Sequence, residues 1–356
     1  MTLDRPLLAD TFLGEARNHF SGRRVIVTGA TGFIGRRLVA GLLLVGASVT
    51  VVLRSNHGAN QFEAAGAEVL VGQLQDHAFM SKALNDKEIL FHLAYDVRSG
   101  GQENLHVFND LYEVAQASEL ERIVHMSSLV VYDHWPGGKI DSDAAITRTG
   151  LEDYRDAKIA MEEALMAGAK PAAILQPGIV HGPGSALWTT APREALKRGP
   201  VILPDPIGLC PAIHVDDVVQ AALRAAMVND LGHERFVLCG RDPLDWRAFY
   251  QSHIDALGQG VVELQPVETL KARLPVPTTS GGGSQSPSAA ARISQSLRKL
   301  IGRERFERWI GMVRNLVQSS GPVYPDHNML TLMSARGDIC DAQTRARIGY
   351  DPQHGV

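Results

Sequence analysis

The chain has 356 residues, a hydrophobic content of 45% and a formal net charge of −4. This length is enough for one large domain and a smaller lobe, with a substantial core. Because nucleic-acid-binding proteins concentrate positive charge on one face, the charge balance gives no reason to expect DNA or RNA as a partner.

The cysteines and the apolar runs argue against other classes of protein. Cys210, Cys239 and Cys340 are widely spaced and lack the C-x-x-C pattern of metal and redox sites, so we expect no metal. The N-terminal residues mix charged with apolar side chains, unlike a secretory signal, and we expect a cytoplasmic protein. The longest uncharged run, residues 38–53, is shorter than the ~20 residues that cross a bilayer, so no transmembrane segment is predicted.

Strand-like and helix-like segments alternate from residue 23 onward. Short apolar, β-branched segments predict strands at Arg24–Thr28, Ser48–Leu53, Glu68–Val71, Ile89–Leu93, Arg122–Met126, Ala172–Gln176 and Arg235–Leu238. Helices are predicted at Ile34–Val45, His77–Leu84, Leu105–Ala117, Asp153–Met166 and Asp216–Met227. This alternation predicts an α/β fold, a Rossmann-like doubly wound parallel sheet with helices on both faces.

Two local patterns point to chemistry. The first strand turns into a helix through Gly29, Gly32 and Gly35, and the free N–H groups of such a helix N-terminus can hold a dinucleotide pyrophosphate. The same glycine spacing also occurs in strand-to-helix turns that bind nothing. Tyr154 and Lys158 are one helical turn apart on one face, which suits a proton-transfer pair.

The pattern loosens after Gly178, where prolines interrupt the regular elements. We expect a dinucleotide-binding domain over residues 20–180, to which 212–239 return, and a smaller, mostly C-terminal substrate lobe from 181–211 and 240–356. A flexible tether is predicted near 275–290. A basic amphipathic helix is predicted over about 289–318, either packed on the body with its basic face in solvent or docked on a membrane surface or partner.

The ordered set of motifs resembles the extended short-chain dehydrogenase/reductases of the NAD-dependent epimerase/dehydratase family. The resemblance runs from about residue 23 to 352 and rests on Thr28–Gly35, His92–Ala94, Ser127–Tyr132, Tyr154 with Lys158, Pro177–Gly184 and His214–Val218. It implies an NAD(P)-dependent oxidoreductase that acts on a secondary alcohol or a ketone.

The resemblance also implies catalytic roles. Tyr154 is the expected acid/base, Lys158 its activator, and Ser128 the group that hydrogen-bonds the reacting oxygen. A free phenol has a pKa near 10, so a neighbouring ammonium group has to favour its ionised form near neutral pH.

Cofactor contacts follow from the same resemblance. They are expected at Gly29, Thr31, Gly32, Phe33, Ile34, Gly35, Arg54, Leu93, Ala94, Tyr154, Lys158, Pro177 and Gly178. Arg54 follows the second strand, where an acidic residue usually selects NAD; it favours NADP by pairing with the 2′-phosphate, with help from Arg36 or Arg37. Gln73 stands where an aspartate often contacts adenine, and Asp76 follows it.

Substrate contacts are expected at Tyr95, Ser128, His134 and Trp135. Leu129 and Val130 replace the acid pair of the sugar dehydratases, so that reaction is not expected. Gln176 and Ile179 stand near the places where nucleotide-sugar enzymes often carry arginine and asparagine. Among the histidines, His214 is expected to orient a loop near Asp216 and Asp217 rather than to catalyse.

Three functions remain open. The leading prediction is an epimerase or 4-keto reductase of a sugar or nucleotide sugar, of the kind associated with bacterial polysaccharide synthesis. The first alternative is a reductase of a non-sugar carbonyl, similar to the hydroxysteroid and dihydroflavonol branches of the family. The second is a dinucleotide sensor without catalysis. We expect a small-molecule substrate, and the family resemblance makes a homodimer one expected assembly.

Overall fold

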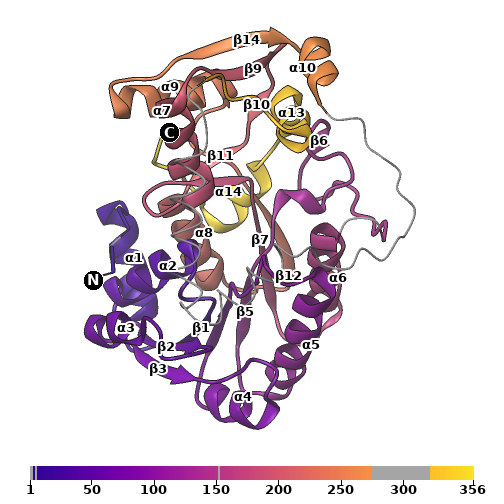
Figure 1. Ribbon diagram of the computed structural model, residues 1–356. Coiled ribbons are helices and arrows are strands. Elements are labelled where there is room, and N and C mark those ends of the chain that lie inside the picture. Colours follow the sequence, from indigo (N-terminus) through magenta and orange to yellow (C-terminus); the bar gives the residue numbers. More distant parts are fainter. Residues whose placement is uncertain (1–2, 5, 151–152, 275–320) are drawn as a thin grey trace, which may run out of the picture.

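A central sheet of seven parallel strands organises the molecule, in the order β12-β7-β5-β4-β1-β2-β3 (Figure 1). The computed structural model describes residues 3–4, 6–150, 153–274 and 321–356. The strands are β1 Arg24–Thr28, β2 Ser48–Leu53, β3 Glu68–Val71, β4 Ile89–His92, β5 Arg122–Met126, β7 Ala172–Pro177 and β12 His233–Leu238. The predicted α/β, Rossmann-like sheet is confirmed.

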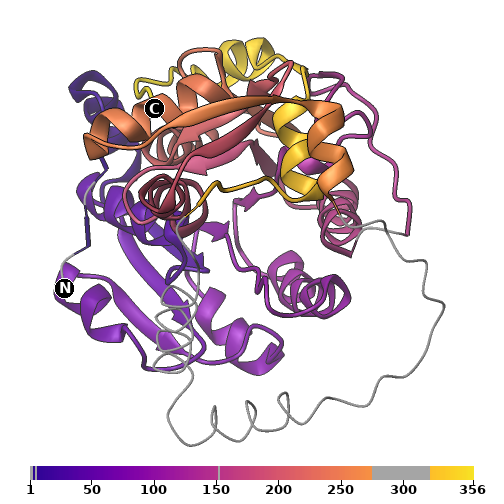
Figure 2. The ribbon, with the colours of Figure 1, turned by 45° about the horizontal axis from the view of Figure 1, so that its top comes forward.

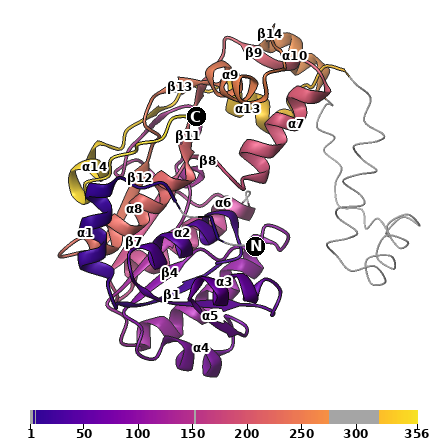
Figure 3. The ribbon, with the colours of Figure 1, turned by 90° about the vertical axis from the view of Figure 1, so that its left-hand side faces the viewer.

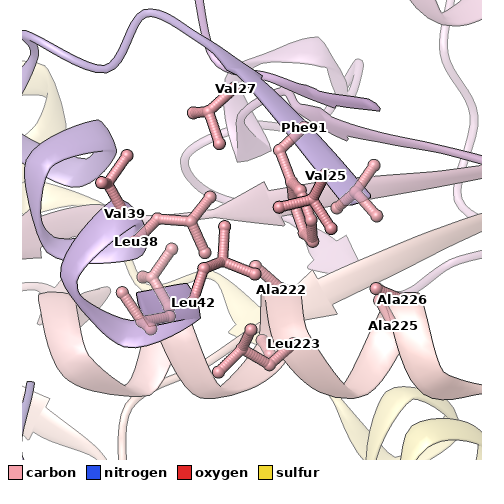
Figure 4. Close-up of a cluster of buried hydrophobic side chains, with 14 of the residues drawn as sticks. Val25, Val27, Leu38, Val39, Leu42, Phe91, Ala222, Leu223, Ala225 and Ala226 are labelled. Carbon is pink, nitrogen blue, oxygen red and sulfur yellow. The ribbon is translucent and has the colours of Figure 1, made fainter. Parts of the chain in front are cut away.

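Helices cover both faces of the sheet. One face carries α1 Asp10–Phe20, α2 Phe33–Leu44, α3 Ala59–Ala65 and α8 Val215–Met227, and the other carries α4 His77–Leu84, α5 Gly101–Ala117 and α6 Asp153–Ala167. Successive residues of a strand point to opposite faces, so Val25 and Val27 belong to one core and Ile26 to the other. Figure 4 shows the first core, where Leu38 and Leu42 of α2 meet the alanines of α8.

A lobe stands over the carboxyl ends of the strands (Figure 3). Its elements are η2 Ala186–Thr190, α7 Ala191–Arg198, β9 Val201–Asp205, β10 Leu209–Cys210, β13 Leu244–Asp245, α9 Trp246–Leu257, β14 Val262–Pro266, α10 Val267–Arg273 and α13 His327–Ser334. Buried Trp246 and Phe249 pack with Leu203 and Met333 in its core. Figure 2 shows α10 and α13 side by side at one end of the lobe.

Short elements join the lobe to the sheet. They are η1 Leu129–Val131, β6 Lys139–Ile140, β8 Ile179–His181, β11 Ala212–His214, β15 Asp338–Ile339 and α14 Ala342–Ile348. Strand β8 pairs with β11, and β6 pairs with β15. The expected tether at 275–290 and the expected amphipathic helix at 289–318 lie outside the described residues.

Residues after α14 return to α8. Gln220 of α8 donates to the carbonyl oxygen of Asp351 at 2.8 Å and accepts from its N–H at 2.9 Å. The Asp217 carboxylate accepts from the N–H groups of Gln353 and His354. The C-terminal residues are therefore tied to α8, which packs on the sheet. Within the described part of the chain, no helix combines the length and apolar character that a bilayer span requires.

Candidate functional site

A cavity of about 430 Å³ lies at the carboxyl ends of β1 to β4. The chain crosses from one side of β1 to the other between β3 and β4, and ligands of open α/β sheets bind at such a switch point. Six of the expected cofactor residues line it: Gly29, Thr31, Gly32, Arg54, Leu93 and Ala94. Gln73 and Tyr95, the latter expected to contact the substrate, line it as well. Its volume is in the range of small-molecule sites.

Glycines shape the floor of this cavity. Gly29 has φ +74°, and a Cβ there would lie 2.5 Å from the carbonyl carbon of Leu93. A Cβ on Gly35 would collide with the Gly29 carbonyl oxygen, so Gly35 lets α2 pack closely against the turn. Helix α2, which opens with Phe33 and Ile34, has no side-chain cap and no acidic residue in its first turn. Its N-terminus therefore fits the negative charge of a dinucleotide pyrophosphate.

The two basic residues of α2 have different partners. Buried Arg37 donates two hydrogen bonds to the Asp216 carboxylate, at 2.6 and 2.9 Å, so the expectation that it helps to bind a 2′-phosphate is wrong. Arg36 donates to the carbonyl oxygen of Thr31 at 3.0 Å.

Arg54 stands on the cavity wall with 63% of its side chain exposed. It donates to Asp96 at 2.9 Å, and the pKa of Asp96 is lowered mainly by its hydrogen bond with Arg98 and also by that with Arg54. A 2′-phosphate at Arg54 would therefore compete with Asp96. Asp76 accepts from the N–H of Phe79 and caps α4, whereas Gln73 faces the cavity.

Ser128 and Tyr154 meet beyond the end of β5. Ser128 is the N-cap of η1, and its Oγ accepts from the Val130 N–H at 3.4 Å. Burial of the Tyr154 hydroxyl raises its pKa, and a hydrogen bond with Ser128 acts in the opposite direction. The Tyr154 ring, 41% exposed, meets the edge of the Tyr95 ring at a centroid distance of 5.0 Å. The structure thus brings three of the expected site residues together.

Lys158 lies buried one turn after Tyr154 in α6. Its Nζ donates to the Met126 carbonyl oxygen at 2.8 Å and lies 4.8 Å from the centre of the Tyr95 ring. Burial lowers the pKa of Lys158 to about 8, against the opposing charge of Glu162. The Lys158 ammonium thus lies over the ring of Tyr95, which in turn meets the ring of Tyr154.

A buried carboxylate that the sequence reasoning missed lies one turn further along α6. Glu162 accepts from Ser127 Oγ at 2.5 Å, from Gln176 Nε2 at 3.0 and 3.1 Å, and from Arg235 Nε at 2.7 Å. Gln176 in turn accepts from the Tyr132 hydroxyl at 2.6 Å. This network fixes α6 to β5, β7 and β12 beneath the site. The available signal was an acidic residue four positions after Lys158, on the same helical face.

Arg155, also missed, holds the turn that contains Ser128. Its guanidinium donates to the carbonyl oxygens of Val130, Val131 and Thr147, and to the Asp133 carboxylate at 2.6 Å. Because Arg155 and Tyr154 are adjacent on α6, these bonds fix η1 relative to the phenol.

A pair of histidines lies behind the cofactor cavity. His92 and His125 approach at 2.9 Å between their Nδ1 atoms. Burial lowers the pKa of His92 to about 3 and that of His125 well below its usual value, with Lys158 acting in the same direction. Both rings are therefore neutral near pH 7 and do not add charge to the site.

Of the remaining expected residues, some line a cavity and others do not. Trp135 lines a second cavity together with Tyr154, whereas His134 is exposed in a turn outside the described cavities. Pro177 ends β7, and a Cβ on Gly178 would collide with the Pro211 carbonyl oxygen. Both lie outside the lining of the cofactor cavity.

His214 has the expected structural role, since its Nδ1 accepts from the Asp216 N–H and caps α8. His214, Asp216 and His354 bring potential metal-ligand atoms within 4.8 Å of one another. The Asp216 carboxylate is already bound by Arg37, which offsets the charge that would attract a cation.

The family model described as NAD(P)H-binding matches residues 29–201, which include the glycine turn, Ser128 and the Tyr154–Lys158 pair. The match shows an NAD(P)H-binding domain and agrees with the resemblance to the extended short-chain dehydrogenase/reductases. The chain is an NAD(P)-dependent enzyme.

Three curated relatives share about a quarter of the aligned residues with this chain. A 4-hydroxy-2-methyl-3-oxo-4-farnesyl-3,4-dihydroquinoline-1-oxide ketoreductase of Stigmatella aurantiaca is 24% identical, over 79% of this chain and 83% of the relative. A ceramide reductase of Caulobacter vibrioides is 25% identical, over 66% and 70%. Sterol demethylase protein B of Methylococcus capsulatus is 25% identical, over 60% and 69%.

Solved structures of epimerases share the fold. An epimerase from Methanothermobacter thermautotrophicus superposes with a TM-score of 0.69 at 16% identity, covering 98% of this chain and 92% of its own. MoeE5 in complex with UDP-glucose and NAD gives a TM-score of 0.61 at 21% identity, with 94% of each chain covered. At these identities the likeness shows the fold alone.

Proposed function

We propose that the chain is an NAD(P)H-dependent reductase of a ketone carried on a largely apolar molecule. The observation that carries this proposal is the position of Tyr154, whose ring meets that of Tyr95 on the wall of the glycine-bordered cavity at the carboxyl edge of the sheet. Ser128 lies close enough to lower the pKa of the Tyr154 hydroxyl. A bound nicotinamide cofactor in its reduced form supplies the hydride that adds to the carbonyl carbon. Tyr154 gives its phenolic proton to the carbonyl oxygen, and Ser128 donates a hydrogen bond to that oxygen as negative charge develops.

Several contacts support an apolar substrate. Leu129 and Val130, directly after Ser128, offer no proton donor or acceptor for a dehydration. Gln176 is fully buried and bonded to Tyr132 and Glu162, and Ile179 is only 6% exposed, so neither is available to a nucleotide diphosphate. The names of the three curated relatives refer to a farnesyl compound, a ceramide and a sterol, which are mainly hydrocarbon.

A second candidate is the sugar epimerase or 4-keto reductase. The observation in its favour is the polar lining of the cavity around Tyr154, which includes Asp133, Thr147, Thr149 and Asp153. Hydroxyl groups of a sugar would find hydrogen-bond partners there. As an epimerase, the enzyme would return the hydride to the opposite face of the keto intermediate, with no net consumption of cofactor.

Turnover assays separate the two functions. The purified protein is incubated with NADH or NADPH and either steroid and long-chain ketones or UDP-glucose, and both cofactor and products are measured. We expect stoichiometric cofactor oxidation with the apolar ketones and a loss of at least ~10²-fold in Tyr154→Phe. Tyr112→Phe is the matched control, because its hydroxyl bonds the Ala164 carbonyl away from the site. Ketone reduction that survives in Tyr154→Phe would refute the mechanism, and epimerised sugar without net oxidation would assign the second function.

A further inference from the structure

A cavity of about 270 Å³ lies over β7 and β12, at the same edge of the sheet as the cofactor cavity. Leu238 and Cys239 enter it from the end of β12, and Leu129 enters it from the turn after β5. The lobe closes the other side with Leu244 of β13 and Leu332 of α13. The crevice above the carboxyl ends of the strands is where open α/β sheets bind ligands.

The charges on this cavity are already paired. Its four charged side chains form two ion pairs, Arg241 with Asp242 at 2.7 Å and Arg345 with Asp341 at 2.8 Å. No net charge is left on the lining to attract an ionic group, and an ionic ligand would lose its water without gaining a partner.

Several polar groups of the walls are also engaged, whereas Asp341 Oδ2 is buried without a hydrogen-bond partner. The Cys239 thiol donates to the Ile339 carbonyl oxygen at 3.6 Å, and the Cys239 carbonyl accepts from the Tyr350 hydroxyl at 2.7 Å. The Leu209 N–H donates to the Ala335 carbonyl oxygen at 2.8 Å. A ligand therefore meets mostly carbon, and hydrocarbon is the chemistry that gains from burial here.

The turn η1 connects this cavity with the reacting groups. Leu129, next to Ser128, faces the apolar cavity, and Val130 faces the cavity that holds Tyr154. The apolar cavity and the cavity of Tyr154 therefore border the same turn, next to Ser128.

We infer that the cavity over β7 and β12 binds an uncharged hydrocarbon chain or ring of the substrate. This inference deepens the proposed reductase function and rests on it. Leu129, Leu238, Leu244 and Leu332 would then contact the apolar part of the ketone. Tyr154 and Ser128 would bind its carbonyl oxygen.

Direct binding tests the inference without relying on turnover. The probes are laurdan and prodan, neutral naphthyl ketones that carry a dodecanoyl and a propionyl chain, and their fluorescence reports transfer out of water. Each buried methylene strengthens binding about fourfold, so we expect laurdan to bind the wild type at least ~10-fold more tightly than prodan.

Two variants fill the cavity. Leu332→Trp and Leu244→Trp should each weaken laurdan binding by at least ~10-fold and prodan binding much less, because the indole occupies the space for the chain. Val261→Trp is the matched control, since Val261 is 54% exposed and outside the cavity lining, and it should bind laurdan like the wild type. Circular dichroism and NADPH binding identify variants that remain folded.

Equal binding of laurdan and prodan by the wild type would overturn the inference. Unchanged laurdan binding in both folded tryptophan variants would also overturn it. A protein that binds laurdan in this cavity yet reduces no ketone would instead contradict the proposed function, so the two failures are distinguishable.

Discussion

Removal of the Glu162 carboxylate gives a sharp test of the network beneath the site. Glu162→Ala leaves three groups without their acceptor: the Ser127 hydroxyl, the Gln176 amide and the Arg235 guanidinium. Ser127 and Gln176 are almost fully buried, and each unsatisfied donor costs about 1–3 kcal/mol. Arg235 keeps 23% of its side chain exposed, so water relieves part of its penalty.

We therefore expect Glu162→Ala to lower the free energy of unfolding by about 3–5 kcal/mol, the range for one partner removed from a buried ion pair. Glu162→Gln should cost less, about 1–2 kcal/mol, because its amide can still accept from Arg235 and donate to Ser127. The cost of Glu162→Gln relative to the wild type reports the loss of the charge. The further cost of Glu162→Ala reports the loss of the remaining hydrogen bonds.

Urea unfolding followed by circular dichroism measures these changes as shifts of the midpoint. Glu163→Ala is the matched control, since Glu163 is the next residue of α6 and its ion pair with Arg148 is about half-exposed on both sides. A surface pair of this kind contributes at most about 1 kcal/mol. If Glu162→Ala destabilises the protein no more than Glu163→Ala does, the network does not hold α6 in place.

Three further predictions concern the cofactor, the pH profile and the fold. Arg54→Ser should raise the KM for NADPH by at least ~10-fold and change that for NADH little, because Arg54 would lose its contact with the 2′-phosphate; equal effects on both cofactors would contradict this role. The pKa of Lys158 is lowered to about 8, so the lysine loses its charge as pH rises through that value, and kcat/KM for ketone reduction should fall there. Glu162→Gln should move this fall to lower pH, since the Glu162 charge raises the pKa of Lys158; a fall at the same pH in both proteins would assign it to another group. Asp216→Ala should lower the free energy of unfolding by about 3–5 kcal/mol, because Arg37 would remain buried without its partner; an unchanged urea midpoint would show that Arg37 finds another acceptor.

Periodicity and apolar content predicted the sheet well. All seven strands lie where the sequence places them, because buried parallel strands are apolar on both faces and stand out from their surroundings. Among the helices that cover the sheet, α1 and α3 were missed, and the lobe helices α7, α9, α10 and α13 were not predicted. Phe12, Ala16 and Phe20 of α1 are buried against α8, and this packing partner lies about 200 residues away in the sequence.

The sequence predicted the local motifs of the site but not the contacts between distant segments. The glycine turn, Ser128 and Tyr154 are local motifs, so their residues can be read directly. The partners of Arg37 and Lys158 depend on contacts between distant segments, such as Arg37 with Asp216 and Lys158 with Met126. Each ion pair of the apolar cavity is local in sequence, between residues 241 and 242 and between residues 341 and 345. The two pairs are about 100 residues apart, and only the fold brings them to one cavity.

The C-terminal residues hold the end of the chain against α8. Gln220 and Asp217 bind the backbone of Asp351 and Gln353 through three hydrogen bonds of 2.8 to 2.9 Å. These bonds join the last residues of the chain to a helix that packs on the sheet. Weakening Gln220 should therefore loosen the C-terminal segment without altering the groups that perform the reaction.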